Sequence, residues 1–383
     1  MLFACLSLIA HAYTQNSKYS YTTGAEQTDA YFGVLSTYKS IGLVVNQTSV
    51  FKDKHLVDTL LSAGLRLTKL FSPEHGLRGT ADAGELVSGG RDTRTGLEIV
   101  SLYGSKTKPT TKDLAGIDAI VYDIQDVGVR FFTYISTLYY VAEACAQNNI
   151  PLYILDRPNP NGDYVDGPIL QPKFKSFVGV LPVPIVYGLT PGELAQYMVG
   201  EKLIDKAEKL QLTVIPLKGY KHSDSVFLPI KPSPNLNTYQ AIRLYPSLCL
   251  FEATAFSIGR GTLLPFQIIG NQDTASGDFT FTPKSLPGFS KNPPLLDTLC
   301  YGVDLSHLNP IPRFTLQYFF RFNSMAKNRK SIINRKSFFD LLAGSDQLRL
   351  QLESGMTEEE IRKTWQEDLD LYLAKRKKYL IYP

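Results

Sequence analysis

The chain has 383 residues, of which 44% are hydrophobic and 20% are charged, as is ordinary for a globular protein. This length predicts two domains that are each large enough to have a real core. The small net charge of +4 argues against a nucleic-acid-binding protein, which would need clustered Lys and Arg. Beyond the N-terminus no stretch is apolar for long enough to be a transmembrane segment. The four cysteines have no zinc-type spacing, and no cofactor is predicted.

The first twelve residues are apolar and end in Ala10-x-Ala12, a small-residue pattern typical of signal-peptide cleavage sites. We therefore expect residues 1–12 to be a signal peptide, although they lack its usual basic start. Export would place the protein in the periplasm or outside the cell. Residues 2–5, Leu-Phe-Ala-Cys, also match a lipoprotein cleavage box, so a lipid-anchored form is an alternative. An apolar segment packed on the core would have the same composition.

Short apolar runs alternate with helical patterns in the first half of the chain. Runs rich in β-branched and aromatic residues indicate buried strands. They lie at residues 41–45, 67–71, 119–123, 152–156 and 212–215. Helical spacing occurs at 54–63 and near 131–148, and Thr190 to Glu193 forms a capping box that opens a further helix. This alternation predicts an α/β domain with a doubly wound parallel sheet, at residues 30–216. The Gly-rich stretch 76–96 is too long for a routine connection and is predicted to be a functional loop or lid.

The second half of the chain has a different pattern. Prolines at positions 229, 232 and 234 interrupt it, and strand-like and irregular segments are expected to about residue 325. The chain then ends in a helix, for which Thr357 to Glu360 supply a capping box. Its predicted core face consists of Ile361, Trp365, Leu369 and Tyr372. These features predict a smaller C-terminal α+β domain at residues 217–383.

Three polar clusters follow three of the predicted strands. They are Ser-Pro-Glu-His-Gly at 72–76, Asp-Ile-Gln-Asp-Val-Gly-Val-Arg at 123–130 and Asp-Arg-Pro-Asn-Pro-Asn-Gly at 156–162. In a parallel sheet, ligands bind outside the carboxyl ends of the strands. Pro, Gly, Asn and Asp also dominate ordinary turns. Three such clusters at the same edge nevertheless favour a binding or catalytic site.

Glu74 is the strongest catalytic candidate. Pro73 restricts the backbone before it, and Gly76 permits close approach of the main chain. A carboxyl group at the mouth of a buried strand is well placed for general acid catalysis. The alternative is a Glu that caps the following turn. His75 is predicted to be a hydrogen-bonding neighbour of Glu74.

Several other polar residues allow two interpretations. Arg130 either binds a carboxylate of a ligand or neutralises Asp126, and Arg157 has the same two possibilities with Asp156. Asn159 suits either a turn or a sugar hydroxyl. Residues 259–262, Gly-Arg-Gly-Thr, place an arginine either against a ligand or on a surface turn.

Three familiar signatures are absent from the sequence. There is no G-x-S-x-G nucleophile elbow, no P-loop and no G-x-G-x-x-G after a strand. A doubly wound sheet without a dinucleotide fingerprint argues against a dehydrogenase.

The combined motifs resemble those of the NamZ-type exo-β-N-acetylmuramidases. The matching segments are Asn-Gln-Thr at 46–48, Ser-Pro-Glu-His-Gly-Leu-Arg-Gly at 72–79, residues 122–130, residues 156–160 and Pro-Ser-Pro-Asn-Leu at 232–236. The resemblance extends from about residue 40 to the C-terminus. It implies a Rossmann-like domain, a smaller C-terminal domain and an active cleft between them. It also implies hydrolysis of terminal, non-reducing N-acetylmuramic acid (MurNAc) from peptidoglycan fragments such as MurNAc-GlcNAc. The family's proposed catalytic glutamate falls on Glu74.

Under this resemblance, other residues acquire candidate roles. Glycoside hydrolysis usually needs a second carboxyl group, for which Asp123 and Asp126 are candidates, but the 2-acetamido group of the substrate can act instead. Arg130, Arg157 and Arg260 are candidates for binding the lactyl carboxylate of MurNAc. The remaining candidates for sugar binding are Asn46, Gln125, Asn159, Asn235 and Glu252.

Two other functions remain open from the sequence. A non-catalytic muropeptide- or glycan-binding protein would show saturable binding without release of sugar. A metal-dependent hydrolase using His75, Asp123 and Asp126 would lose its activity with a chelator.

Overall fold

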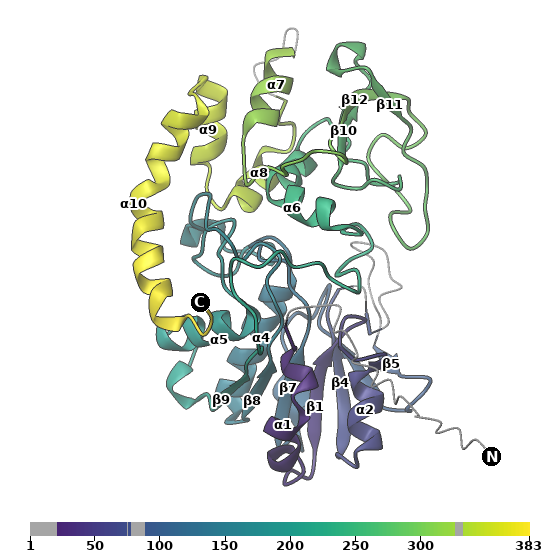
Figure 1. Cartoon of the computed structure of the whole chain (residues 1–383), viewed down its shortest axis with the longest axis vertical. Helices are drawn as coiled ribbons and strands as arrows, with labels where there is room; N and C mark the ends of the chain where they lie inside the picture. Colours follow the sequence, from purple (N-terminus) through teal and green to yellow (C-terminus); the bar gives the residue numbers. More distant parts are fainter. Residues whose placement is uncertain (1–20, 75, 78–88, 326–331) are drawn as a thin grey trace, which may run out of the picture.

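The computed structural model describes residues 21–74, 76–77, 89–325 and 332–383 (Figure 1). A seven-stranded sheet occupies one half of the molecule, and a three-stranded antiparallel sheet with several helices occupies the other. The prediction of an α/β fold with a smaller C-terminal α+β part is therefore confirmed.

The large sheet has the order β5-β6-β4-β1-β7-β8-β9, and only the pairing of β5 with β6 is antiparallel. Its strands are β1 (Ile41–Val45), β4 (Leu67–Ser72), β5 (Gly90–Arg91), β6 (Glu98–Ser101), β7 (Ala119–Asp123), β8 (Leu152–Leu155) and β9 (Leu212–Ile215). The chain builds outward from β1 through β4 and β6, and then returns to the other side of β1 with β7. The topological switch point, where doubly wound folds bind ligands, therefore lies between β1 and β7.

Helices cover both faces of this sheet and bury its strands in two hydrophobic clusters. On one face lie α1 (Thr28–Leu35) and α2 (Leu56–Ser62), and on the other lie α4 (Tyr134–Asn148) and α5 (Pro191–Gly200), with the short α3 (Thr111–Leu114) near α4. The predicted capping box of α5 is present. The predicted helix over 54–63 begins only at Leu56, because residues 54–55 form β3 (Lys54–His55), which pairs with β2 (Val50–Phe51).

The second half contains β10 (Ile268–Asn271), β11 (Phe279–Phe281) and β12 (Cys300–Asp304) in the antiparallel order β10-β12-β11. It also contains α6 (Tyr239–Leu248), which the sequence analysis did not predict. Pro246 lies inside α6 and cannot donate to the carbonyl of Ile242. The side chain of Asn161 donates to that carbonyl instead, at 3.2 Å, so the helix continues through the proline.

Four helices complete the second half: α7 (Gln317–Met325), α8 (Lys336–Ala343), α9 (Gln347–Ser354) and α10 (Glu358–Arg376). The long α10 runs down one side of the molecule and ends beside α5 (Figure 1). Its predicted capping box and its predicted buried face are both confirmed.

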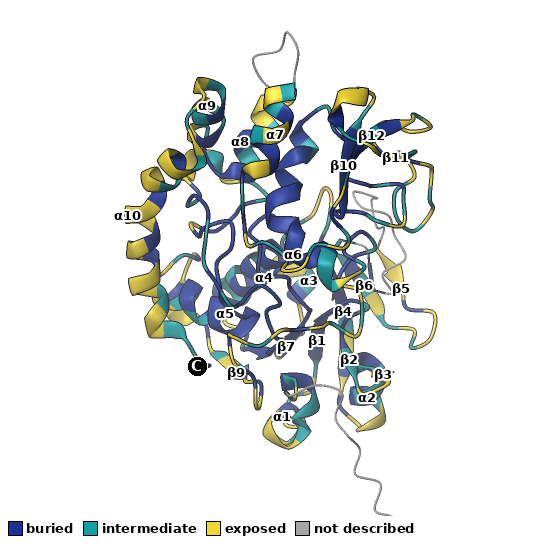
Figure 2. Ribbon diagram, turned by 45° about the horizontal axis from the view of Figure 1, so that its top comes forward, coloured by how far each residue is buried: buried dark blue, intermediate teal, exposed yellow. Residues whose placement is uncertain are grey.

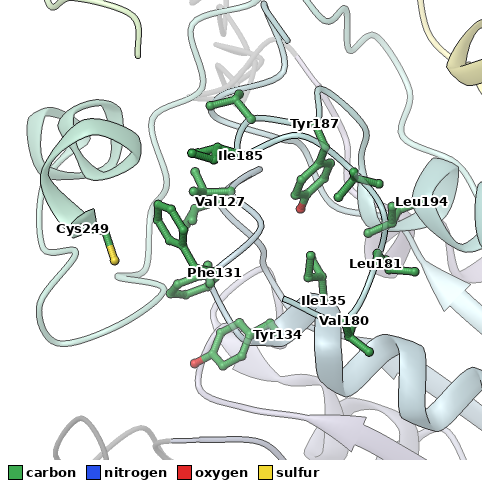
Figure 3. Packing of buried hydrophobic residues seen from close by; sticks show 14 of the residues in the cluster. Val127, Phe131, Tyr134, Ile135, Val180, Leu181, Ile185, Tyr187, Leu194 and Cys249 are labelled. Atoms are coloured by element: carbon green, nitrogen blue, oxygen red, sulfur yellow. The ribbon is translucent and has the colours of Figure 1, made fainter. Parts of the chain in front are cut away.

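One hydrophobic cluster extends through both halves, as the continuous buried interior in Figure 2 shows. Phe131, in the loop after β7, packs edge-on against Tyr245 of α6 with ring centroids 5.2 Å apart, and Tyr245 in turn contacts Phe266. Figure 3 shows part of this cluster around Phe131, Ile135 and Tyr187. The loops at the carboxyl edge of the large sheet are therefore held against the second half by shared core packing.

Candidate active site

Glu74 lies two residues beyond the end of β4 and is half-buried. Its Oε2 accepts a hydrogen bond of 3.0 Å from the hydroxyl of Thr133. The hydroxyl of Tyr103, which follows β6, also hydrogen-bonds this carboxylate. Two hydroxyl groups from neighbouring elements therefore hold the carboxyl group of Glu74.

Thr133 occupies the N-cap position of α4, but its hydroxyl does not cap the helix. A Thr at this position ordinarily bonds a main-chain amide of the first turn. Here the hydroxyl is directed to Glu74 instead, and the positive end of the helix dipole lies near the carboxylate. The start of α4 therefore supplies a hydroxyl group that fixes the position of the Glu74 carboxyl group.

Two tyrosines share this environment. Burial, followed by the negative charge of Glu74, raises the pKa of Tyr103 above its usual range, and the same two causes raise the pKa of Tyr134. Both phenols therefore stay protonated near neutral pH and serve as hydrogen-bond donors. The hydroxyl of Tyr134 donates to the carbonyl of Pro232 at 3.0 Å, which ties a loop of the second half to this edge of the sheet.

Asn46 follows β1 and is fully buried. Its Oδ1 accepts hydrogen bonds from the amide and the hydroxyl of Thr48, and its side chain lies near the hydroxyl of Tyr134. Gln47 donates to the carbonyl of Pro232 at 3.1 Å. The structure thus brings Asn46 and Glu74 into one polar cluster around Tyr134.

Asp123 and Arg157 form a buried, two-pronged ion pair. The Nε and Nη2 atoms of Arg157 lie 2.6 and 2.7 Å from the two carboxylate oxygens of Asp123. Such a planar pair is the strongest geometry for these groups. Of the two interpretations of Arg157, an ion pair with Asp156 is therefore wrong. The carboxylate of Asp156 accepts from Thr190, Gly192 and Tyr382, and from the main-chain amide of Arg157.

Asp126 is buried on the loop after β7. Its Oδ2 accepts hydrogen bonds from the amide of Gly128 and the hydroxyl of Tyr187. Burial raises the pKa of Asp126 to about 7, although these two hydrogen bonds act in the opposite direction. A catalytic role for Asp123 or Asp126 stays a prediction, and both carboxylates already hold protein partners.

Arg130 is fully buried and donates to four main-chain carbonyl groups. Its partners are Pro168, Val183, Leu342 and Ala343. Of the two interpretations of Arg130, neutralisation of Asp126 is therefore wrong. The guanidinium instead joins the loops after β8 to the end of α8, and burial lowers its pKa to about 9.

Asn159 and Asn235 are both buried and bonded to the main chain. Asn159 donates to the carbonyl of Leu189 and accepts from the amide of Asn161, so it shapes the turn after β8. It packs directly on Gly128, where a Cβ would lie 2.0 Å from its Oδ1 and where φ is +76°. Asn235 donates to the carbonyl of Phe289 at 2.8 Å.

The remaining candidates divide between two places. Gln125 and Arg157 line one pocket of about 330 Å³ at the carboxyl ends of β7 and β8. Glu252 and Arg260 pair with each other in the second half, with Arg260 Nε 2.8 Å from Glu252 Oε1. His75 and most of the Gly-rich stretch lie outside the described residues.

No pattern in the sequence indicates that Thr133, Tyr103 and Tyr134 lie around Glu74. Tyr103 follows β6, a strand whose run Glu-Ile-Val-Ser is too short and polar to stand out. Thr133 carries the signal of a helix start, but nothing local indicates that its hydroxyl turns to another strand.

Within the described ranges, no group of three or more His, Cys, Asp or Glu side chains is arranged to hold a metal ion. Over the same ranges, no helix is both long and apolar enough to cross a membrane.

Two family models match nearly the whole chain from residue 41 onward. The model described as exo-β-N-acetylmuramidase NamZ, N-terminal, matches residues 41–240, and its C-terminal counterpart matches residues 243–382. The chain belongs to the NamZ exo-β-N-acetylmuramidase family. As a NamZ homologue it is related to glycoside hydrolases, and the boundary between the two NamZ models falls within α6.

Individual NamZ relatives cover most of the chain. The peptidoglycan β-N-acetylmuramidase NamZ of Bacillus subtilis is 39% identical over 369 residues, which is 90% of this chain and 87% of that protein. A crystal structure of a DUF1343 family protein from Bacteroides fragilis is 43% identical, with a TM-score of 0.86, over 94% of this chain and 99% of that one. A second B. fragilis DUF1343 structure is 29% identical, with a TM-score of 0.83, over 95% of this chain and 99% of that one.

Proposed function

We propose that this protein is an exo-acting glycosidase that releases terminal non-reducing MurNAc from peptidoglycan fragments, with Glu74 as its general acid. The observation that carries the role of Glu74 is its position. It lies at the carboxyl edge of a doubly wound sheet, beside the switch point, where two hydroxyl groups fix its carboxyl group. The reaction and the substrate follow from the 39% identical peptidoglycan β-N-acetylmuramidase.

In this proposal Glu74 protonates the glycosidic oxygen as the bond to the leaving sugar breaks. The proton moves from the carboxyl group to the leaving oxygen, and the anomeric carbon develops positive charge. Thr133 and Tyr103 hold the carboxyl group in place, which maintains the geometry on which proton transfer depends.

The second catalytic group of the proposed reaction is the 2-acetamido group of the substrate. Asp123 is bonded through both oxygens to Arg157, and Asp126 is buried against Tyr187 and Gly128. Asp123 would have to release Arg157 to attack the sugar or to activate water, and Asp126 is buried, although its Oδ1 has no hydrogen-bond partner in the described part of the chain. An acetamido oxygen that attacks the anomeric carbon avoids that cost, as in the substrate-assisted glycosidases.

The test is release of free MurNAc from the disaccharide MurNAc-GlcNAc by the wild type and by Glu74→Gln. The wild type is expected to release MurNAc with or without EDTA, and Glu74→Gln to be slower by about 10²-fold or more. Near-normal activity of Glu74→Gln would show that Glu74 is not the general acid. Saturable binding without release would point to a glycan-binding protein, and loss of activity with EDTA to a metal-dependent hydrolase.

We also propose that the protein is exported, free in the periplasm or medium or held by a lipid. The support is the apolar N-terminal sequence with its Ala10-x-Ala12 pattern, which lies outside the described residues. Cell fractionation together with the mass of the mature N-terminus tests this. An intact N-terminus in the cytoplasmic fraction would contradict it.

A further inference from the structure

A pocket of about 330 Å³ lies at the carboxyl ends of β1, β7 and β8. Thr48, Gln125 and Arg157 follow these three strands and line it. Residues 228–230 and the β2–β3 hairpin, which lies beside α2 in Figure 2, supply further walls. The pocket thus occupies the switch point of the sheet, where ligands bind in this architecture.

This pocket and Glu74 lie at the same carboxyl edge of the large sheet. The guanidinium of Arg157 rests on Asp123 at the end of β7, and Glu74 follows β4, with only β1 between these two strands. Two strand spacings correspond to about 10 Å. The loop that lines the pocket at Ile230 continues to Pro232, which Tyr134 bonds in the Glu74 cluster. The pocket and Glu74 are therefore at the same edge of the sheet and are connected by one loop.

The pocket combines cations with an apolar wall. Asp123 fixes the Nε edge of Arg157, and Nη2 also donates to the carbonyl of Val50 at 3.3 Å. Among the described residues, no hydrogen bond involves its Nη1. Lys52 is exposed on the turn of the β2–β3 hairpin and also lines the pocket, as do the apolar Val50 and Ile230.

The pocket also contains one carboxylate, that of Glu26. Its Oε2 accepts from the amide and the hydroxyl of Thr23, and its charge faces Arg157. Asp123 and Glu26 together balance Arg157 and Lys52. Recognition of an anion here would therefore depend on directed hydrogen bonds from a fixed guanidinium more than on net charge.

We propose, on the basis of the muramidase function proposed above, that this pocket receives the lactyl group of the MurNAc ring bound at Glu74. Its carboxylate binds Arg157 and Lys52, and its methyl group lies against Val50 and Ile230. Of the other two candidate arginines, Arg130 is engaged by four carbonyl groups, and Arg260 pairs with Glu252; neither lines this pocket. The lactyl ether is the only difference between MurNAc and GlcNAc, so the pocket determines which of the two sugars is cleaved.

The test compares two substrates, MurNAc-GlcNAc and the same disaccharide with its lactyl carboxylate as a methyl ester. The ester keeps the sugar and the lactyl methyl group and removes the charge. The wild type is expected to prefer the acid by about ten-fold in kcat/KM, as the loss of a charge-assisted hydrogen bond would give. Release of MurNAc or its ester is measured over a range of substrate concentrations.

Lys52→Gln is expected to reduce this preference about three-fold by raising KM for the acid alone, as the loss of an exposed ion pair would. Lys202→Gln is the matched control. Lys202 is likewise exposed and has φ +53°, against +56° for Lys52, but it follows α5 and does not line the pocket. It should leave both substrates unaffected.

Arg157→Lys keeps a cation beside Asp123 but removes the planar fork. We expect it to abolish most of the preference for the acid while the ester is still cleaved. A thermal melt shows whether Arg157→Lys is folded. If it is not, the acid and ester kinetics of Lys52→Gln decide the test.

The outcomes separate the two proposals. The pocket assignment is wrong if the wild type cleaves acid and ester equally, or if Lys52→Gln and Arg157→Lys lower kcat/KM by the same factor for both substrates. In either case the proposed hydrolase function still stands. If the wild type releases sugar from neither substrate, the proposed function is wrong, and the pocket assignment fails with it.

Discussion

The hydroxyl of Thr133 lies 3.0 Å from Glu74 Oε2, so a residue placed to cap α4 instead holds a carboxylate that follows β4. The two residues are 59 positions apart in the sequence. Their contact depends on β4 and β7 flanking β1, which puts the end of β4 near the start of the helix that follows β7.

Thr133→Val should lower kcat by about ten-fold with little change in KM, because the carboxyl group loses a fixed hydrogen bond of about 1.5 kcal/mol. Thr133→Ser should restore most of the rate, since Ser keeps the hydroxyl. Thr137→Val is the matched control. Thr137 lies one turn further along α4, is buried, and its hydroxyl has no hydrogen-bond partner in the described part of the chain. Equal rate losses at both positions would show that packing of α4, and not the bond to Glu74, sets the rate.

Asp123→Asn should destabilise the protein by about 3–5 kcal/mol, because it removes the carboxylate that is bonded directly to the buried guanidinium of Arg157. The free energy of unfolding is measured by urea titration. The exposed pair of Glu359 and Lys363 on α10 provides the comparison, and Glu359→Gln should cost less than about 1 kcal/mol. Similar losses of unfolding free energy in Asp123→Asn and Glu359→Gln would show that burial does not determine the cost of breaking an ion pair here.

Asp126 should make the protein less stable as pH rises. Burial raises its pKa from 3.8 to about 7, so between these values the folded state keeps a proton that the unfolded state has lost. Its contribution is therefore most favourable below about pH 4 and is lost progressively up to about pH 7. Relative to Asp126→Asn, the wild type should lose about 1 kcal/mol of unfolding free energy per pH unit in this window. For Asp53→Asn, at an exposed site, the curve of unfolding free energy against pH should run parallel to that of the wild type. If the curve for Asp126→Asn also runs parallel to that of the wild type, the prediction is wrong.

The C-terminal tail should contribute measurably to the stability of the large sheet. The hydroxyl of Tyr382 donates to Asp156 Oδ2 at 2.6 Å and accepts from the amide of Leu217 at 2.8 Å. Tyr382→Phe leaves the amide of Leu217 without its acceptor and removes one of the hydrogen bonds to the buried Asp156, and it should cost about 3 kcal/mol in a urea titration. Tyr379→Phe, which removes a bond to Glu201 at a less buried site, should cost about 1 kcal/mol or less. Equal costs would show that the tail adds little beyond surface contacts.

Local sequence was sufficient to predict five strands of the large sheet and both capping boxes. Strands such as 119–123 are continuous apolar runs with sharp polar ends, and a capping box is defined by residues three apart. Local sequence was insufficient for β6, whose residues are only partly apolar. It was also insufficient for α6, because Pro246 argues against a helix and the hydrogen bond that replaces the missing one comes from the distant Asn161. Both misses depend on partners distant in sequence.

The sequence by itself determined where the polar clusters stand, because Pro, Gly and charged residues end each buried strand, and it directed attention to Glu74. Only the tertiary structure decided the partners of each charge. Arg157 reaches Asp123 because β7 and β8 are adjacent and parallel, and Arg130 finds carbonyl groups because the loops after β8 and the end of α8 close around it. Ion pairs and hydrogen bonds depend on distances of a few ångströms between residues far apart in the chain. Such distances follow from strand order and packing, which no local pattern contains.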